Sequence, residues 1–428
     1  KRFTFTNPNY PFKIDCSIVK TSKKKRDYIS TYNIEESNVF NNPENYEIEI
    51  ELINSQAKFI NPSRADIELS EREFLMQKIR KGIKVVLSGW QQTNFPISYR
   101  EIQQMQQEYL SLIRKEGKEE KSKSYNNNSR DRKRINNRDF IGPSSISLET
   151  QNIVPLQEDA NIPNINGPYT VTDKADGARK LLFINKKGKI YLIDTNMNMQ
   201  FTGSITRHSK YFNSILDGEH VLNDKQGEFI NIYLSFDIYM INGKYVKQFP
   251  FYKTSDEEKE DTFRLELMYK FVNGLDSKCV SKSYATPLII REKKFYSNID
   301  SDIYSKCKII LDGIEDDSMF NYETDGLIFT PANKSVGSSS SHELTQPRKM
   351  TWNYSLKWKP SKYNTIDFLV TTVKDESGND TIKNLFQEGI SMDASSQIQQ
   401  YKTIILRVGF DENKHGFIHP CQDVINEN

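Results

Sequence analysis

Lys174 is the residue of this sequence whose surroundings most clearly allow covalent chemistry. It opens the run Lys-Ala-Asp-Gly-Ala-Arg at 174–179, directly after a strand-like stretch. A free lysine amine has a pKa of ~10.4, so a nucleophilic lysine must be made neutral by its surroundings. Nearby cations, with Lys357, Lys359 and a bound metal ion as candidates, would lower that pKa. The same cations would neutralise the charge of a triphosphate, so a triphosphate is the electrophile that a neutral Lys174 would attack.

Four short runs further along the chain supply the other groups that such chemistry needs. Glu219, in Leu-Asp-Gly-Glu, and Asp325, in Thr-Asp-Gly-Leu-Ile-Phe, are carboxylates suited to a hard divalent cation or a ribose hydroxyl. Phe236, in Ser-Phe-Asp-Ile, offers a flat face for a purine. Lys357 and Lys359 stand in Leu-Lys-Trp-Lys-Pro. Taken singly, an Asp-Gly pair is more often a turn, so the functional interpretation depends on finding these runs together.

A second set of carboxylates lies near the start of the chain. Glu47, Glu49 and Glu51 alternate with Ile48 and Ile50, so a strand here would hold three carboxylates on one face. Three aligned carboxylates repel one another, which favours a bound cation over a purely structural role. An exposed edge strand is the alternative, because acidic strands also face water.

Hydrophobic periodicity predicts the elements that must position these groups. Strand-like patterns occur at 12–18, 46–52, 181–184, 190–193, 232–238, 327–330, 366–373 and 403–408. Ser70 with Glu73, and Ser98 with Glu101, fit the capping box and predict two helix starts.

The segment between these helices and Lys174 has the composition of a linker. Residues 114–138 hold ten Lys or Arg against four acids and show no apolar periodicity. A basic segment could guide RNA, but a soluble tether is the plainer explanation. We expect an N-terminal module, the linker, a catalytic domain and a small β domain, at residues 1–117, 118–139, 140–360 and 361–428.

Composition limits the classes of protein to be considered. The 428 residues carry 59 basic against 57 acidic side chains, so the net charge of +2 does not by itself predict nucleic-acid binding. No apolar run reaches the ~18 residues of a membrane span, which predicts no membrane partner. Cys16, Cys279, Cys307 and Cys421 form no Cys-x-x-Cys pair, which argues against a zinc ribbon and a disulfide framework.

The runs around Lys174, Glu219, Phe236, Asp325 and Lys357 resemble, in this order, motifs I, III, IIIa, IV and V of the covalent nucleotidyltransferases. That superfamily contains the mRNA guanylyltransferases and the ATP- or NAD-dependent polynucleotide ligases. The ligases usually carry Glu-Gly in motif IV, whereas this chain carries Asp-Gly, so the resemblance is to the guanylyltransferases. The Glu-x-Glu-x-Glu strand is similar to the metal-binding strand of the triphosphate tunnel RNA triphosphatases. These are fused to guanylyltransferases in poxvirus and giant-virus mRNA capping enzymes.

The resemblance implies a multidomain α+β fold. It would comprise part of a triphosphate-tunnel β-barrel, a nucleotidyltransferase domain of antiparallel sheets flanked by helices, and a partial OB-fold. The tunnel family has a second Glu-x-Glu strand, which nothing before Glu35 supplies, and no Arg-x-Asp-Lys motif VI occurs before Asn428. We therefore expect both end domains to be incomplete and this chain alone to lack RNA triphosphatase activity.

The resemblance also implies a reaction in two steps. Lys174 would attack the α-phosphate of GTP to give lysyl–GMP, and the 5′-diphosphate end of RNA would then take the GMP as its cap. The implied ligands of Mg²⁺ or Mn²⁺ are Glu47, Glu49, Glu51 and Asp325. The implied nucleotide-binding residues are Thr172, Asp176, Gly177, Arg179, Glu219, Phe236, Asp325, Lys357 and Lys359.

Within that set, Arg179 and Glu219 would hold the ribose, Phe236 would stack on guanine, and Lys357 with Lys359 would bind the α-phosphate. Further implied partners are the 5′ end of nascent mRNA, a methyltransferase domain or subunit and a viral RNA polymerase. The implied location is the host cytoplasm, at the viral factory, or the virion. Two alternatives stay open: an ATP-dependent polynucleotide ligase, and a nucleotide-binding scaffold that has lost catalysis.

Overall fold

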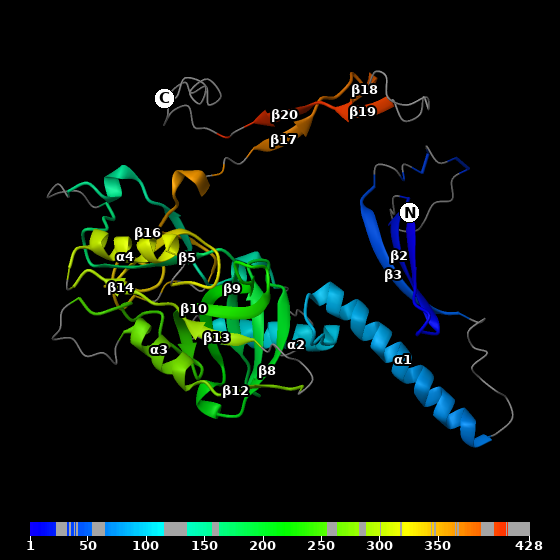
Figure 1. Ribbon diagram of the computed structural model, residues 1–428, viewed down its shortest axis with the longest axis horizontal. Coiled ribbons are helices and arrows are strands. Elements are labelled where there is room, and N and C mark those ends of the chain that lie inside the picture. The colour runs from blue at the N-terminus through cyan, green and yellow to red at the C-terminus, as the bar shows by residue number, and fades with distance from the viewer. Residues whose placement is uncertain are drawn as a thin grey trace, which may run out of the picture. The chain divides into compact units, whose positions relative to one another are not determined.

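The computed structural model of the chain forms two compact units, Lys1–Trp358 and Lys359–Asn428 (Figure 1). Apart from a few single positions, the residues that it describes are 1–22, 42–53, 65–114, 135–155, 162–254, 263–281, 288–299, 301–316, 319–343, 348–363, 368–386 and 398–407. Only the backbone is described at 65–72, 384–386 and 398–400. The chain is a mixed α+β, sheet-rich protein, as predicted.

The N-terminal part is an antiparallel sheet of β1 (Arg2–Thr6), β2 (Phe12–Lys20) and β3 (Glu44–Leu52), in that order. The strands predicted at 12–18 and 46–52 are confirmed. Asp15 and Ser17, on the polar face of β2, are buried, whereas Ile14 on the apolar face is only partly covered. Phe12, on the apolar face, is buried as well, so both faces of β2 are partly covered. The described residues form an open three-stranded sheet rather than a closed barrel.

Two helices follow, α1 (Ala65–Gln91) and α2 (Tyr99–Ile113). The predicted start at Ser70 is wrong: α1 already begins at Ala65, since the Ala, Glu and Leu residues before Ser70 favour helix. The predicted start at Ser98 is confirmed, because its hydroxyl accepts the amide of Glu101 at 3.1 Å. The Glu101 carboxylate accepts from the Lys189 ammonium at 2.6 Å, which ties α2 to the sheet that follows.

The centre of the first unit is an eight-stranded sheet in which β11-β10-β9-β6-β7-β8-β12 are neighbours and β13 pairs with β10. Its strands are β6 (Ala178–Ile184), β7 (Lys189–Asp194), β8 (Met199–Thr206), β9 (Ser214–Asn223), β10 (Phe229–Ile241), β11 (Lys244–Tyr245), β12 (Ser277–Cys279) and β13 (Ile289–Glu292). All pairings are antiparallel except β10 with β13. The strands predicted at 181–184, 190–193 and 232–238 are confirmed.

Each face of this sheet carries a helix, because neighbouring side chains of a strand point to opposite faces. Tyr109 and Ile113 of α2 pack in one hydrophobic cluster with Phe183 of β6. Met268 of α3 (Arg264–Gly274) packs in a second cluster with Leu182. Figure 1 shows α3 beside β10 and β13.

A five-stranded sheet lies alongside, in the order β14-β5-β15-β16-β4. Its strands are β4 (Ser144–Ser147), β5 (Tyr169–Ala175), β14 (Tyr296–Ser297), β15 (Thr324–Pro331) and β16 (Thr351–Trp358). Ile303 and Ile310 of α4 (Ile303–Glu315) pack against Val171 and Leu327 of this sheet. The two sheets with α3 and α4 lie within residues 140–360, the range expected for a catalytic domain.

The expected linker at 118–139 lies mostly outside the described residues. Its described end, 135–139, is folded: a 3₁₀ turn spans Asn137–Asp139, and Asp139 forms an ion pair with Arg114 at 2.7 Å. The helix α2, which we assigned to the N-terminal module, belongs to the hydrophobic core of the catalytic domain.

The second unit contains two antiparallel strand pairs. They are β17 (Leu369–Thr372) with β20 (Ile404–Arg407), and β18 (Ile382–Phe386) with β19 (Ile398–Lys402). These strands agree with the β-rich composition predicted for 361–428, and an OB-fold stays a prediction. None of the described helices is long and apolar enough to span a membrane.

The packing of α2 predicts the effect of shortening one of its buried side chains. Ile113 is 1% exposed, so Ile113→Ala should lower the free energy of unfolding of the catalytic domain by about 2–5 kcal/mol. Gln104→Ala, on the exposed side of the same helix, should change it by less than about 0.5 kcal/mol. Urea unfolding measures both, and equal small effects would contradict the placement of α2 in this core.

Candidate active site

Lys174 lies on β5 directly against Asp325 of the neighbouring strand β15. The register of these strands shifts between Thr324 and Leu327, so a bulge at Asp325 and Gly326 stands opposite the lysine. Gly326 has a φ of 150°, a conformation that a residue with a Cβ rarely adopts. The Lys174 Nζ donates to Asp325 Oδ1 at 2.6 Å, and both side chains are mostly buried. The Asp-Gly pair therefore aims a carboxylate at the candidate nucleophile.

Lys174 lines a cleft of about 310 Å³ between the two sheets of the catalytic domain, and Asp325 contacts it from beside that lining. Thr172, Ile328 and Lys357 are direct neighbours on β5, β15 and β16, and all three line the cleft. The residues predicted from the sequence that line it are Thr172, Lys174, Arg179, Glu219, Phe236 and Lys357. The structure thus brings together side chains that are spread over most of the catalytic domain.

Arg179 is held rigidly at one side of the cleft. Its Nε and one terminal nitrogen donate to the two carboxylate oxygens of Asp217, at 3.1 and 2.5 Å. Asp217 is fully buried and also accepts the Tyr239 hydroxyl at 2.5 Å. The other terminal nitrogen of Arg179 donates to the Pro143 carbonyl at 2.7 Å. Sequence reasoning quoted Asp217 within a motif but gave it no role, although it fixes the arginine.

Phe236 reaches the cleft because β10 is irregular at this residue. The pairing of β10 with β9 shifts register between Ser235 and Asp237, which leaves Phe236 as the bulged residue. Asp237 forms a bidentate ion pair with the buried Arg264. The Nε and Nη2 atoms of Arg264 donate to the two carboxylate oxygens of Asp237 at 2.9 and 3.1 Å. The fixed geometry of this pair holds the bulge and so the direction of the Phe236 ring.

Lys293 is a cleft residue that the sequence analysis missed. It is 4% exposed, and its Nζ forms an ion pair with Asp173 at 3.0 Å. The Tyr322 hydroxyl donates to the same carboxylate at 3.2 Å. Because Asp173 precedes Lys174 on β5, this buried pair anchors the strand that carries the nucleophile. No local pattern marks Lys293, since it meets Asp173 only in the folded chain.

Glu219 is a cleft carboxylate whose pKa is raised by burial. Burial raises its pKa to about 7, against the opposing effect of the cations Lys293, Arg179 and Lys174. Gly177 lies against it: a Cβ there would come within 2.8 Å of the His220 carbonyl oxygen and 3.0 Å of Glu219 Cγ. Glycine is needed at 177 for this close approach.

Four of the predicted nucleotide-binding residues are not part of the cleft lining: Asp325, which contacts Lys174, and Asp176, Gly177 and Lys359. Asp176 is exposed in the turn between β5 and β6, where its amide donates to the Glu323 carbonyl. Gly177 acts through its contact with Glu219. Lys359 begins the second unit, so its role stays a prediction. A larger cavity of about 980 Å³ lies between α2 and the 185–189 turn, and none of the predicted site residues lines it.

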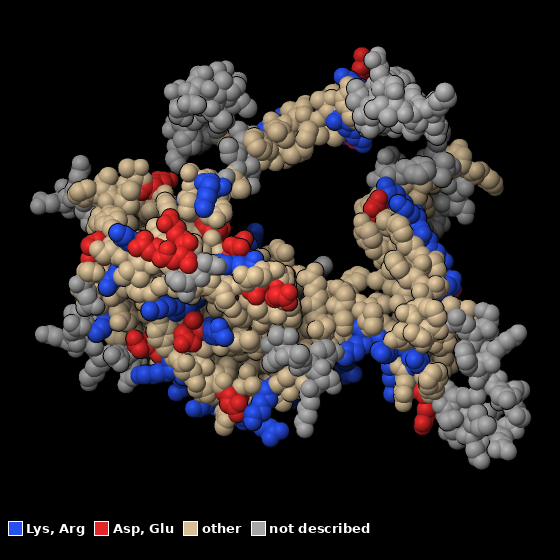
Figure 2. Space-filling view, in the orientation of Figure 1, with Lys and Arg blue, Asp and Glu red and all other residues tan. Residues whose placement is uncertain are grey.

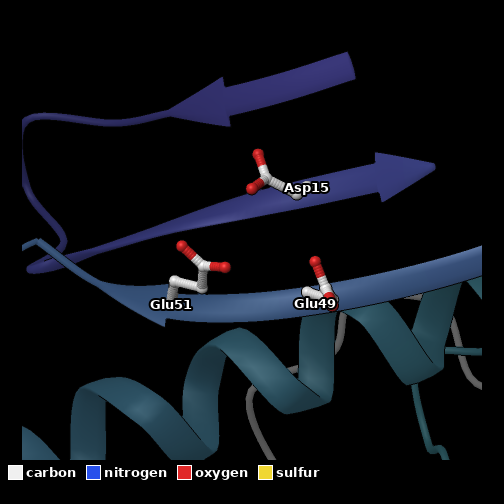
Figure 3. Close-up of side chains that lie close together, drawn as sticks. All are labelled: Asp15, Glu49 and Glu51. Atoms are coloured by element: carbon white, nitrogen blue, oxygen red, sulfur yellow. The ribbon is translucent and has the colours of Figure 1, made fainter. Parts of the chain in front are cut away.

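A second candidate site lies on the N-terminal sheet. Asp15, Glu49 and Glu51 place carboxylate oxygens within 4.8 Å of one another, and Figure 3 shows them side by side on β2 and β3. Asp15 was not predicted as a metal ligand, because it is one of the polar residues that alternate with apolar ones in the strand predicted at 12–18. Glu47 was predicted as a ligand but is not in this group: it lies further along β3, opposite Ser17.

The donor set of this group fits a hard divalent cation, which prefers carboxylate oxygens. Asp15 is fully buried and its Oδ1 has no hydrogen-bond partner. Arg2 pairs with Glu49 at 3.1 Å, and Lys13 pairs with Glu51 at 2.9 Å. These cations neutralise the carboxylates in the structure, and a metal ion would have to displace them.

Comparisons with known proteins find a sequence family and several relatives that this chain resembles. Residues 100–360 match the sequence model described as mRNA capping enzyme, catalytic domain. A probable mRNA-capping enzyme of Acanthamoeba polyphaga mimivirus is 24% identical over 425 residues, which are 90% of this chain and 30% of that protein. The mRNA-capping enzyme of Danio rerio is 26% identical over 300 residues, 66% of this chain and 44% of that protein. The chain thus spans less than half the length of these curated relatives.

Among solved structures, a mycobacterial DNA ligase D complexed with ATP and MES is similar to this chain with a TM-score of 0.31 and 11% identity. The similarity covers 55% of this chain and 63% of that chain.

The acidity of Glu219 predicts a pH-dependent stability. Its pKa is about 7 in the folded state against the ordinary 4.5, so between these values the folded state holds the proton more tightly than the unfolded state. This group therefore makes the free energy of unfolding fall as pH rises from 4.5 to 7. Glu219→Gln should remove that fall and stabilise the protein by roughly 2–3 kcal/mol above pH 7, relative to the parent.

Urea unfolding of parent and variant across this pH range measures the difference. Glu323→Gln, an exposed change on the neighbouring turn, is the matched control and should leave the pH profile of stability unchanged. Parallel profiles for the parent and Glu219→Gln would contradict the burial argument.

Proposed function

This chain belongs to the mRNA capping enzyme family, with the catalytic domain at residues 100–360, and we propose that it is a GTP:RNA guanylyltransferase. The observation that carries the proposal is the position of Lys174. Its amine lies at the border of a cleft that also presents an aromatic ring, an arginine and a second lysine to one bound nucleotide. This set fits a covalent nucleotidyl transfer in two steps.

In the first step the Lys174 nitrogen bonds to the α-phosphorus of GTP, and the bond from that phosphorus to pyrophosphate breaks. The amine has to give up one proton before it attacks, and Asp325, 2.6 Å away, is placed to accept it. A second proton leaves the nitrogen as the phosphoramidate forms. In the second step a 5′-diphosphate oxygen of RNA attacks the same phosphorus, the nitrogen–phosphorus bond breaks, and Lys174 is regenerated.

The remaining cleft residues bind and orient the nucleotide. Phe236 provides the face on which guanine stacks, and its bulge fixes the plane of the ring. Arg179 and Glu219 face each other across β6 and β9, at a place that suits the ribose hydroxyls. Lys357 lies two strands from Lys174 and is suited to hold the α-phosphate. Such positioning can contribute several kcal/mol to lowering the barrier.

A divalent cation completes this chemistry. Mg²⁺ or Mn²⁺ would neutralise phosphate charge when bound, and the Asp325 carboxylate beside Lys174 is suited to hold it. Holding a cation would also draw the carboxylate away from Lys174. Lys359 remains a candidate second ligand of the α-phosphate.

For the N-terminal sheet we propose an RNA 5′-triphosphatase module whose cation is held by Asp15, Glu49 and Glu51. The mutual approach of these carboxylates and the unpartnered Asp15 Oδ1 support it. A part of a triphosphate tunnel is the fold that we propose for this module.

The proposed substrates are GTP and the 5′ end of nascent mRNA. We further propose a methyltransferase domain or subunit and a viral RNA polymerase as partners, and the host cytoplasm or the virion as location. The ATP-dependent ligase is disfavoured because motif IV carries Asp325 rather than glutamate. The inactive scaffold is disfavoured because Lys174 and Lys357 are both retained in the cleft.

Removal of the nucleophile is the first test of this function. With radiolabelled GTP and a divalent metal, the parent should form an acid-stable labelled adduct, and Lys174→Ala and Lys174→Arg should form none. Arginine keeps its proton and cannot attack phosphorus. Lys308→Arg, on α4, should label like the parent. Labelling by ATP would instead indicate a ligase, and no label from either nucleotide would favour the scaffold.

The N-terminal metal site can be tested by comparing neighbouring carboxylates. Glu49→Gln and Asp15→Asn should each weaken Mn²⁺ binding by at least about tenfold, because each removes a charged ligand. Glu47→Gln is the matched control, since it removes the same charge from the same strand outside the group. Calorimetry or Mn²⁺ paramagnetic resonance measures the affinity. If Glu47→Gln weakens binding as much as Glu49→Gln, the assigned ligand set is wrong.

A further inference from the structure

A groove lies where the end of α1 and the first turns of α2 meet the β6–β7–β8 part of the eight-stranded sheet. It consists of two cavities of about 530 and 390 Å³ that share Gln92, Leu192 and Gln200 in their lining. Lys180 of β6 lines the groove, whereas Arg179 before it lines the cleft. The groove and the nucleotide cleft therefore receive successive residues near the start of one strand, whose side chains point to opposite faces of the sheet.

Two large aromatic side chains stand open to solvent at this groove. Trp90 and Tyr99 are 69% and 74% exposed, although both line the same cavity. Exposed aromatic rings beside a cavity are platforms on which unpaired nucleic-acid bases stack. Five side-chain amides line the same cavity. Those of Gln91, Asn198 and Gln200 are hydrogen-bonded within the protein, whereas those of Gln92 and Gln106 offer donors and acceptors to base edges.

The electrostatics of the groove suit a polyanion. Arg80 and Lys84 are exposed on α1, and four-residue steps place them on the same helix face as Ser88, which lines the groove. Figure 2 shows Lys and Arg side chains gathered over α1. Asp194 is the one acid among the lining residues, and its carboxylate accepts the backbone amides of the turn that follows it.

The inner end of the groove is uncharged. His220 lines it, and burial, with help from Lys180, lowers the pKa of His220 to about 4, so the ring is neutral at neutral pH. Its Nε2 lies 2.9 Å from Asn231 Oδ1. A neutral, amide-rich pocket between aromatic platforms suits a base better than a phosphate or a carboxylate.

We propose that this groove binds the single-stranded RNA downstream of the 5′ end that is capped. Bases stack on Trp90 and Tyr99, the amides contact base edges, and the phosphates run along Arg80 and Lys84. The inference rests on the proposed guanylyltransferase function, because that reaction requires an RNA acceptor. The groove would hold the strand on one face of the sheet while its 5′ end passes the start of β6, at Ala178, to reach the cleft on the other face.

The test compares the intact chain with a Trp90→Ala/Tyr99→Ala variant in binding an RNA of about ten nucleotides. Loss of one stacking platform should weaken RNA binding about tenfold, and loss of both about a hundredfold. The fold-loss of RNA affinity in the aromatic variant should be the same at low and at moderate salt, because stacking releases no counterions. The fold-loss of RNA affinity in an Arg80→Gln/Lys84→Gln variant should instead become smaller as the salt concentration rises. Trp90→Phe keeps a ring and should retain most of the affinity.

Phe74→Ala is the matched control, an exposed aromatic on α1 that does not line the groove, and should bind RNA like the parent. The formation of lysyl–GMP from GTP should be unchanged in every variant, which shows that they fold and separates this proposal from the proposed function. If the parent forms no lysyl–GMP, the proposed guanylyltransferase function is wrong, whereas the RNA-binding measurements still test the groove. Full RNA affinity in the Trp90→Ala/Tyr99→Ala variant would contradict the proposed RNA site and would favour a protein as the partner of the groove.

Discussion

The contact between Lys174 and Asp325 is the constraint around which the catalytic domain is organised. A lysine that attacks phosphorus must be held at one point and must lose its charge there, and both requirements depend on the group beside it. The bulge at Asp325 and Gly326 places a carboxylate 2.6 Å from the amine across a strand pair. A flexible loop could not hold that distance, whereas adjacent strands of one sheet fix it.

The rest of the site is kept in place by buried ion pairs behind the cleft. Asp217 holds Arg179, Arg264 holds the bulge at Phe236, and Lys293 with Asp173 anchors the strand of the nucleophile. Burying charge is costly, so such pairs add little stability, but breaking one leaves an uncompensated charge. We therefore infer that these ion pairs orient the side chains of the cleft. Each pair joins an element of the cleft to a residue that is distant in the sequence.

The parts of the fold and site that could be predicted are those that depend on local pattern. Short β-rich runs predicted three strands of the eight-stranded sheet, β6, β7 and β10, and the Ser98 cap predicted the start of α2. The order of the motifs identified six residues that the cleft then brought together. The start of α1 was misplaced because a serine that can cap a helix can also lie within one.

The residues that escaped prediction are those whose role arises only from long-range pairing. Asp15 looked like one polar position in an apolar strand until β3 brought Glu49 and Glu51 to it. Lys293 has no neighbours in the sequence that mark it, and Trp90 and Tyr99 line one groove only because α1 and α2 meet there.

The assignment of Lys174 as the nucleophile is tested most directly by locating the covalent adduct. The protein is incubated with GTP and a divalent metal, and its peptides are analysed by mass spectrometry. GMP is expected on Lys174 alone, and GMP on any other residue would contradict the assignment.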